Sequence, residues 1–471
     1  MFLGSGAWAW LVMAAAPGQL DPDTYFHFLV SRQLADGKLW LDIGWLPFTV
    51  LGEAGPDHHW LWHLLLAPLT LAGEPDFALQ VTGAVAFAAV PAVLTAILQV
   101  LGVRYAGLWA LLAVFSASVL PGRLLMLRAQ NLALLLVLAS LLCLHSRRLL
   151  ALGLLGFIFM AAYHGAVVLA PLGLIYLAQR WWFDRRVDLT PVLALGGGAT
   201  LALLLTPWPG QNIEYLLFHT LYKTSLTLPG TAGTEWLQLP FSALVTQAWM
   251  AHLLLLLATG LFVYRYRKEP ASQRLPALLL ISVLLFLALF ANSWRFLEYY
   301  APLAVVAAAV VLSGFAQLQR YVPWVLAVLL VGGAWQAGQA ISRAERYDTA
   351  DFAEIRDYLE EHADAGEIVL NSHWPDFPLL LWPEGRQRYV AGLDASYLAF
   401  EDPKRFLLWW QLAAAELELE GDISSVIAES FDTRWVVVNR GNALLADRLR
   451  ASPGAILVAA SARAELFLLK P

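Results

Sequence analysis

Long apolar stretches recur along the first 342 residues of this 471-residue chain, and they limit its possible folds more than any other feature. A helix of about 20 apolar residues spans the hydrocarbon core of a bilayer. Charged residues make up only 14% of the chain, whereas soluble globular proteins carry about 25%. We therefore expect a polytopic α-helical membrane protein. Its eleven candidate transmembrane helices lie at about 1–20, 77–101, 105–121, 129–145, 149–163, 165–179, 190–206, 242–263, 275–291, 302–317 and 323–342.

The distribution of arginine and lysine predicts the orientation of this bundle, because basic residues are enriched in cytoplasmic loops. With a cytoplasmic N-terminus and alternating helices, the inner loops hold 11 basic residues, and the outer loops before residue 343 hold 6. We expect a multi-pass protein of a bacterial-type inner (plasma) membrane. The first outer loop 21–76, the outer loop 207–240 and the C-terminal residues then face the periplasm. No nucleic-acid-binding motif is recognisable, so we expect no nucleic-acid partner.

Residues 343–471 differ in composition from the transmembrane region 1–342. The charged stretch from Arg343 to Glu367 is typical of a helix, and EIVLNSHW, RWVVVNR and AELFLLKP are typical of strands. About 125 residues are enough to bury a core of their own. We expect a small extracytoplasmic α/β domain here, and we interpret its Trp-, Pro- and Asp-containing segment, 371–403, mainly as packing.

The stretch LDPDTYFHF, Leu20 to Phe28, places two carboxylates and an imidazole directly after the first apolar segment. It has two compatible interpretations. In one, Asp21 caps a helix, Pro22 occupies the first helical position, and Asp23 is favourable near the positive end of the helix dipole. The other is a functional interpretation that a family resemblance implies, and burial at the membrane surface together with a second acid is expected to raise a carboxyl pKa there.

This acidic stretch, the long outer loop behind it and the segment DHHWLWHLLLAPLTLAGEPDFAL resemble the membrane-embedded GT-C glycosyltransferases over about residues 1–145. That family includes protein O-mannosyltransferases, lipid A aminoarabinose transferases and oligosaccharyltransferase catalytic subunits. The resemblance implies a polyprenyl-phosphate-linked sugar donor and an acceptor whose identity the sequence leaves open. It also implies that Asp23 acts at the acceptor or at its activating metal, with Asp21 as its neighbour.

Two departures from the oligosaccharyltransferases leave the metal requirement open. The second outer loop, PGRLLMLRAQNLALL, contains no acidic residue, and the Trp-Trp-Asp-Tyr-Gly motif of that group is missing. A divalent cation, Mg²⁺ or Mn²⁺, is one alternative that the resemblance allows. The candidate ligands for it are Asp23, Asp57 and His58.

Histidines are concentrated in DHHWLWH, the stretch from Asp57 to His63. His59 and His63 are four residues apart, so they can share one face of a helix. With Asp57 and His58 they can bind a divalent metal, or together with His27 they can form hydrogen bonds to a substrate or a lipid headgroup. The remaining alternative is interfacial structure. Residues 61–73 are too few to cross a bilayer, so we expect an amphipathic or re-entrant helix there.

The stretch NSWRFLEYYAPLAVV, Asn292 to Val306, resembles the basic-x-x-x-Tyr-x-x-Pro segment of mannosyl- and aminoarabinosyltransferases. Arg295 is our main candidate for holding a lipid phosphate, because a guanidinium binds phosphate oxygens bidentately and a charge at membrane depth is costly. Alternatively, Arg295 pairs with Glu298 or extends to lipid headgroups. The other candidate substrate-binding residues on this outer side are Arg123, Arg128, Glu298 and Tyr300.

These expectations combine into an integral membrane glycosyltransferase that acts among membrane lipids on the periplasmic side. Asp23 engages the acceptor, and Arg295 holds the donor phosphate together with Arg128 or Arg123. A transporter or flippase of a lipid-linked saccharide and a non-catalytic membrane scaffold are the alternatives. The predicted spans carry few charges, which disfavours a transport pathway.

Overall fold

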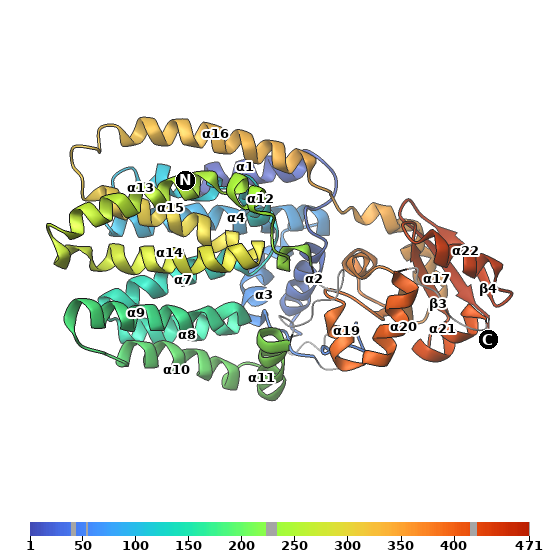
Figure 1. The fold of residues 1–471 in the computed structure, drawn as a ribbon. Coiled ribbons are helices and arrows are strands. Elements are labelled where there is room, and N and C mark those ends of the chain that lie inside the picture. The colour runs from blue at the N-terminus through green and yellow to red at the C-terminus, as the bar shows by residue number, and fades with distance from the viewer. Residues whose placement is uncertain (39–43, 53–54, 223–232, 415–421, 471) are drawn as a thin grey trace.

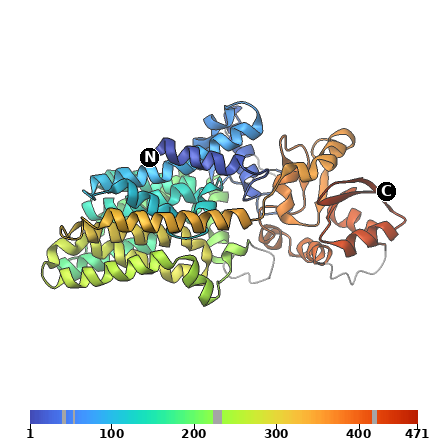
Figure 2. The same cartoon turned by 90° about the horizontal axis from the view of Figure 1, so that it is seen from above.

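The chain forms a helical bundle followed by a sheet-containing part, as the computed structural model shows in Figure 1. The structure describes residues 1–38, 44–52, 55–222, 233–414 and 422–470. The N-terminus lies in the bundle, and the C-terminus lies beside the sheet at the far end of the molecule. Helix α16 (Val322–Arg343) runs along the bundle and leads into the C-terminal part (Figure 2).

Each of the eleven predicted transmembrane segments contains a helix. Within the described residues, six helices are long and apolar enough to cross a membrane: Pro75–Val100, His164–Asp184, Trp249–Tyr266, Pro270–Asn292, Trp294–Ser313 and Val322–Arg343. The other five segments form apolar helices of 10–17 residues; the count of about eleven spans stays a prediction. Besides α16, the helices are α1 (Phe2–Ala14), α4 (Pro75–Val100), α5 (Ala106–Phe115), α7 (Gln130–Ser146), α8 (Leu149–Ala162), α9 (Leu169–Asp184), α10 (Thr190–Leu205), α13 (Trp249–Tyr266), α14 (Arg274–Asn292) and α15 (Leu297–Ser313).

Glycines allow helices α8 and α10 to pack backbone against backbone. A Cβ at Gly198 would lie 1.9 Å from the carbonyl oxygen of Gly153, and one at Gly156 would lie 2.0 Å from that of Leu195. Small residues at such a contact let helices approach closely, which is how apolar helices associate where water is excluded. The close contact between α8 and α10 is therefore possible only because glycine has no Cβ at these positions.

Short helices collect where the bundle meets the C-terminal part (Figure 1). The predicted interfacial piece 61–73 is a short helix, α3 (Trp60–Leu66), continued by the 3-10 turn η1 (Ala67–Leu71). Its position in the membrane interface stays a prediction. Lys223 in the outer loop 207–240 lies outside the described residues. The other short helices of the bundle are α2 (Asp23–Ala35), α6 (Leu120–Leu125), η2 (His164–Val168), α11 (Pro209–Leu217), η3 (Phe218–Tyr222), η4 (Thr234–Trp236), α12 (Phe241–Gln247), η5 (Pro270–Gln273) and η6 (Trp294–Phe296).

The C-terminal part contains a five-stranded sheet with the order β2-β1-β3-β5-β4. Strands β2, β1 and β3 are parallel, whereas β5 is antiparallel to both β3 and β4. All three predicted strands are confirmed as β1 (Ile368–Asn371), β3 (Trp435–Asn439) and β5 (Ala464–Leu469), and the remaining strands are β2 (Arg388–Tyr389) and β4 (Ala455–Ala460). The helices are η7 (Thr349–Phe352), α17 (Ala353–His362), η8 (Trp374–Asp376), α18 (Phe377–Leu381), α19 (Ser396–Glu401), α20 (Pro403–Ala413), α21 (Ile423–Phe431) and α22 (Ala443–Ala451).

The helix predicted from Arg343 to Glu367 was too long. The backbone of Tyr347 instead exchanges two hydrogen bonds with Gln19, with N···O distances of 2.8 and 2.9 Å. A residue in such a bridge cannot also continue a helix, and Asp348 starts a new turn by accepting a hydrogen bond from the backbone N–H of Ala350. The bridge therefore ties the end of the bundle to the chain that precedes α2.

The two faces of the sheet belong to different cores. Val436 and Phe467 point into a core made by the C-terminal residues together with Trp409. On the other face, Val437 belongs to a cluster that includes Phe28 of α2. Because alternate strand residues point to opposite faces, the sheet packs on its own helices with one face and toward the first outer loop with the other. Whether residues 343–471 form an independent extracytoplasmic domain stays a prediction.

The packing of α8 against α10 predicts that Gly198→Ala lowers the unfolding temperature of the purified protein in detergent. Its Cβ has to displace the backbone of α8, and overpacking of this kind costs about 1–3 kcal/mol. Gly197→Ala is the matched control, because nothing lies within 4 Å of its Cβ and alanine favours a helix. Equal unfolding temperatures for the two variants would contradict the close contact.

Candidate active site

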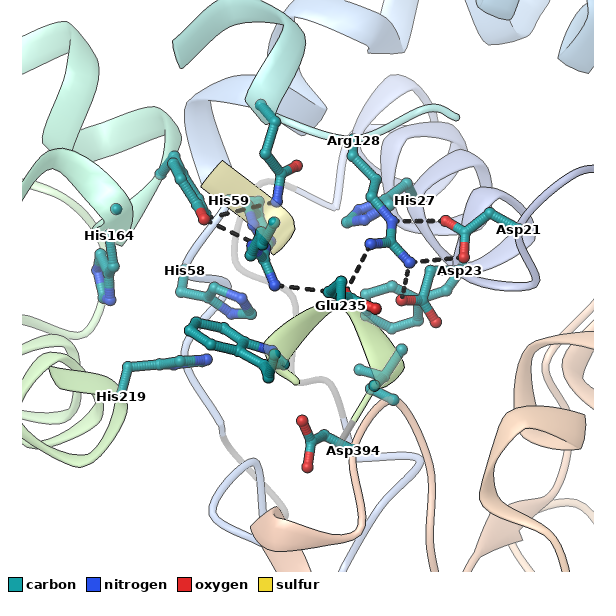
Figure 3. Close-up of a pocket in the computed structure, with 18 of the residues that line it drawn as sticks. Asp21, Asp23, His27, His58, His59, Arg128, His164, His219, Glu235 and Asp394 are labelled. Atoms are coloured by element: carbon teal, nitrogen blue, oxygen red, sulfur yellow. Dashed lines mark hydrogen bonds and ion pairs between the residues drawn. The ribbon is translucent and has the colours of Figure 1, made fainter. Parts of the chain in front are cut away.

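A cavity of about 520 Å³ lies between the short helices of the bundle and the C-terminal part. Segments distant in sequence meet at its walls, and Figure 3 shows the acidic, basic and histidine side chains that face it. Seven predicted site residues line it: Asp21, Asp23, His27, His58, His59, Arg128 and Arg295. The cavity therefore brings the carboxylate after the first helix and the guanidinium near residue 295 to one place.

Arg128 is the centre of the charged groups (Figure 3). It lies two residues before the start of α7 and binds Asp21 through two parallel hydrogen bonds, with Nε–Oδ2 and Nη2–Oδ1 distances of 2.7 and 2.6 Å. Its Nη2 lies 3.4 Å from Oδ2 of Asp23, and its Nη1 lies 2.9 Å from Oε1 of Glu235. One planar guanidinium thus holds three carboxylates from two chain segments, a geometry that a lysine ammonium cannot reproduce.

The capping interpretation of Asp21 is wrong. Helix α2 begins at Asp23, its N-cap is Pro22, and no side-chain oxygen accepts a hydrogen bond from its first N–H groups. The Asp21 carboxylate instead makes the two hydrogen bonds to Arg128. Asp21 is therefore an electrostatic partner in the cavity wall and not a structural cap.

Asp23 has an environment that favours its neutral form. Burial, followed by the nearby charge of Asp21, raises the pKa of Asp23 to about 8, although Arg128 opposes the shift. The Asp23 side chain is 23% exposed, and it lines the cavity. A carboxyl with a pKa close to neutral can both accept and return a proton near physiological pH.

Arg295 pairs with Glu235, not with Glu298. Its Nη1 lies 3.4 Å from Oε1 of Glu235, and its Nη2 donates to the hydroxyl of Tyr163 over 3.2 Å. The guanidinium also lies over the ring of Trp236, with 4.7 Å from Cζ to the ring centroid. Burial opposes ionisation of Glu235, but Arg128 and then Arg295 outweigh it and hold the Glu235 pKa well below its usual range. One carboxylate therefore bridges two guanidinium groups.

Three of the predicted substrate-binding residues are held elsewhere. Arg123 forms a buried ion pair with Glu298 and lies over the ring of Trp294. The hydroxyl of Tyr300 forms a hydrogen bond with Nδ1 of His252. Arg123, Glu298 and Tyr300 are not among the residues that line the cavity, so their geometry supports packing behind the site.

The histidines of the first outer loop are in contact with one another. His58 faces the cavity near His164 and His219, and its ring centroid lies 3.9 Å from that of His59, which forms a further cluster with His27 and the fully buried His63. Burial and then the neighbouring imidazoles hold the pKa of both His58 and His59 well below its usual range, so these rings are neutral.

The structure groups the candidate metal ligands differently from the sequence-based prediction. One ring nitrogen from each of His27, His59 and His63 lies within 4.8 Å of the others. Asp23, proposed as a ligand, interacts with Arg128, and Asp57 is hydrogen-bonded to His63. Three imidazoles suit zinc and similar transition metals, whereas Mg²⁺ prefers oxygen ligands.

Several residues that line the cavity were missed by the sequence analysis. Glu235 was missed although an acid beside a tryptophan in an outer loop is a usable signal. The segment 371–403, interpreted as packing, contributes further lining residues, among them His373, Trp374, Leu393, Asp394 and Tyr397. Leu393 has a φ of +59°, a strained backbone conformation for a leucine. The C-terminal part is therefore one wall of the cavity.

The fold resembles membrane glycosyltransferases of known structure. Over 100% of the chain it matches the arabinofuranosyltransferase AftD from Mycobacteria with a TM-score of 0.57 and 16% identity, and a variant of AftD with 0.59 and 17%. The chain corresponds to 40% and 41% of the length of those two structures. ArnT from Cupriavidus metallidurans, determined with bound undecaprenyl phosphate, matches over 99% of the chain and 97% of its own, with a TM-score of 0.58 and 14% identity.

No protein-family model and no curated protein sequence matches the chain. At identities of 14–17%, the structural matches establish the fold and leave the activity to the site. The sequence-based resemblance is confirmed at this level: the chain has the fold of the GT-C glycosyltransferases.

Proposed function

We propose that the chain transfers a sugar from a polyprenyl-phosphate-linked donor to an acceptor at the periplasmic face of a bacterial-type inner membrane. The observation that carries this proposal is the Glu235 carboxylate, which bridges Arg128 and Arg295 beside Asp23 in one cavity. Two guanidinium groups around one anion are suited to bind a phosphate. The structure of ArnT with undecaprenyl phosphate supports this class of donor.

In the proposed reaction, the acceptor hydroxyl attacks the anomeric carbon of the sugar on the face opposite the phosphate. The bond between that carbon and the phosphate oxygen breaks, and its electron pair leaves with polyprenyl phosphate. Asp23 takes the proton of the attacking hydroxyl. Arg295 and Nη1 of Arg128 compensate the negative charge that develops on the leaving phosphate. Asp21 neutralises the remaining edge of Arg128 and keeps that guanidinium in place.

The donor phosphate has to displace Glu235, because the carboxylate occupies the guanidinium groups that would hold it. Until a donor binds, Glu235 thereby keeps both arginines paired, since an unpaired buried charge is costly. The C-terminal residues contribute to the cavity wall, where the hydroxyl of Tyr397 accepts a hydrogen bond from that of Tyr215 over 2.6 Å.

Asp23→Asn is expected to reduce transfer by about 10²- to 10⁴-fold, the usual contribution of a general base, while binding of polyprenyl phosphate is retained. Transfer is measured with purified protein and labelled polyprenyl-phosphate sugars. Asp36→Asn is the control, because it removes an exposed carboxylate just beyond the other end of α2. Full transfer by Asp23→Asn would remove the base assignment, and movement of intact donor across vesicles without bond cleavage would favour a flippase.

The transfer rate of the wild-type protein is expected to rise with pH and to level off above about pH 8. The base has to be ionised, and its pKa is raised to about 8. Asp21→Asn removes a neighbouring negative charge and frees Arg128, so both effects lower the Asp23 pKa and move the rising limb to lower pH. An unchanged limb in Asp21→Asn would show that another group titrates.

Glu235→Gln is expected to strengthen binding of polyprenyl phosphate by about 10- to 100-fold. The substitution removes a charged group that competes with the phosphate for the arginines, and hydrogen bonds to charged groups contribute about 1.5–3 kcal/mol. Binding is measured by titrating the lipid phosphate into protein in detergent. Glu214→Gln serves as the control, because Glu214 is exposed on α11 and does not line this cavity. Unchanged or weaker binding by Glu235→Gln would contradict the displacement.

A further inference from the structure

Three histidines from two helical segments meet at the wall of the cavity, apart from its charged groups. His27 belongs to the first turns of α2, and His59 and His63 lie one turn apart at α3, where the N–H of His63 donates to the carbonyl oxygen of His59 over 3.0 Å. All three are buried, and one ring nitrogen of each lies within 4.8 Å of the others. Within the described residues, none of the three histidines forms a hydrogen bond with the carboxylates that bind Arg128.

Asp57 positions two of these histidines. Its Oδ2 accepts a hydrogen bond from Nδ1 of His63 over 2.7 Å, and its Oδ1 accepts one from the backbone N–H of His59 over 3.0 Å. A carboxylate that accepts from Nδ1 leaves Nε2 of the same neutral ring with a free lone pair. This arrangement of carboxylate and imidazole is the one that orients metal-bound histidines in proteins.

The lone pairs of the group are incompletely used by the protein. Nε2 of His63 lies 2.7 Å from Nδ1 of His27, whereas Nδ1 of His59 is buried and has no hydrogen-bond partner within the described residues. A buried nitrogen without a partner is costly. In a tetrahedral zinc site with Zn–N distances of 2.0–2.1 Å, ligand nitrogens lie about 3.3 Å apart. From their distance of 2.7 Å, the nitrogens of His27 and His63 need to separate by about 0.6 Å to reach that spacing, whereas the nitrogen of His59, which lies within 4.8 Å of the others, needs to move closer.

We propose that His27, His59 and His63 bind one zinc ion, with Asp57 orienting His63. Two of the three ligands line the cavity and His63 does not, so the coordination position that the protein leaves free opens toward the cavity. Three imidazoles with one open position are typical of catalytic zinc sites. The ligand expected at that position is an oxygen, from an acceptor hydroxyl or from a phosphate. This last assignment rests on the proposed transferase function, whereas zinc binding does not.

Zinc binding is measured on the full-length protein in detergent, after loading with Zn²⁺ and removal of free metal. We expect about one zinc per chain in the wild type by elemental analysis, and strong loss in His63→Ala. Removing an orienting carboxylate typically weakens metal binding by about 10- to 100-fold, which we expect for Asp57→Asn. His362→Ala is the control, because this histidine is exposed on α17.

If His63→Ala folds poorly, the unfolding temperatures of the other variants, measured with and without Zn²⁺, still test the site. Zn²⁺ should raise the unfolding temperature of the wild type and of His362→Ala, because a ligand that binds the folded state stabilises it, and should do so less for His59→Gln and Asp57→Asn. Wild-type protein without zinc, or equal zinc in all variants, would overturn the site. Sugar transfer by zinc-free protein would leave the transferase proposal intact, and zinc binding without transfer would leave the metal site intact.

Discussion

The arrangement of the cavity depends on the Arg128 guanidinium. Asp21, Asp23 and Glu235 come from chain segments more than 100 residues away from it, and each interacts with it. Removing one partner of a buried ion pair typically costs about 3–5 kcal/mol, because the remaining charges stay away from water. Removal of the Arg128 side chain would leave three carboxylates without their shared partner. This one side chain therefore holds together the start of α2, the start of α7 and the η4 turn.

The C-terminal part completes the site by packing on the bundle. The cluster that contains Phe28 also contains Trp382 and Val437, so one face of the sheet depends on the first outer loop for its core. The backbone bridge between Gln19 and Tyr347 also joins the C-terminal part to the bundle, and Gln19 lies only two residues before Asp21. Cavity residues of the C-terminal part, such as Asp394, are therefore placed by packing and hydrogen bonds that involve both parts.

The sequence predicted what depends on local pattern. Apolar length located the helices of the bundle, alternation located β1, β3 and β5, and the resemblance directed attention to Asp23 and Arg295, which do line one cavity. The pairing of charges was not predictable in the same way. Glu298 lies three residues from Arg295, so local spacing favoured that pair, yet Glu298 binds Arg123 across 175 residues.

The histidines show the same limit. Spacing on one helix face connected His59 with His63, but only the packing of α2 against α3 adds His27 to them. The C-terminal lining residues were missed because a segment with Trp, Pro and Asp is equally suited to packing and to sugar contacts. Long-range contacts decide between these alternatives, and a single sequence without an alignment contains no direct record of them.

Two acids beside the arginines, Glu235 and Asp23, have pKa values that are shifted in opposite directions. Glu235 interacts with two guanidinium groups, so its carboxylate stays ionised even though it is buried. Asp23 has one guanidinium at 3.4 Å, and Asp21 has the two shorter hydrogen bonds to that same group. Burial, followed by the charge of Asp21, therefore outweighs the attraction of Arg128 and raises the pKa of Asp23. Such a separation of carboxyl pKa values assigns different chemical roles: Glu235 is a permanent anion, which an incoming phosphate can replace, and Asp23 is a group that exchanges protons.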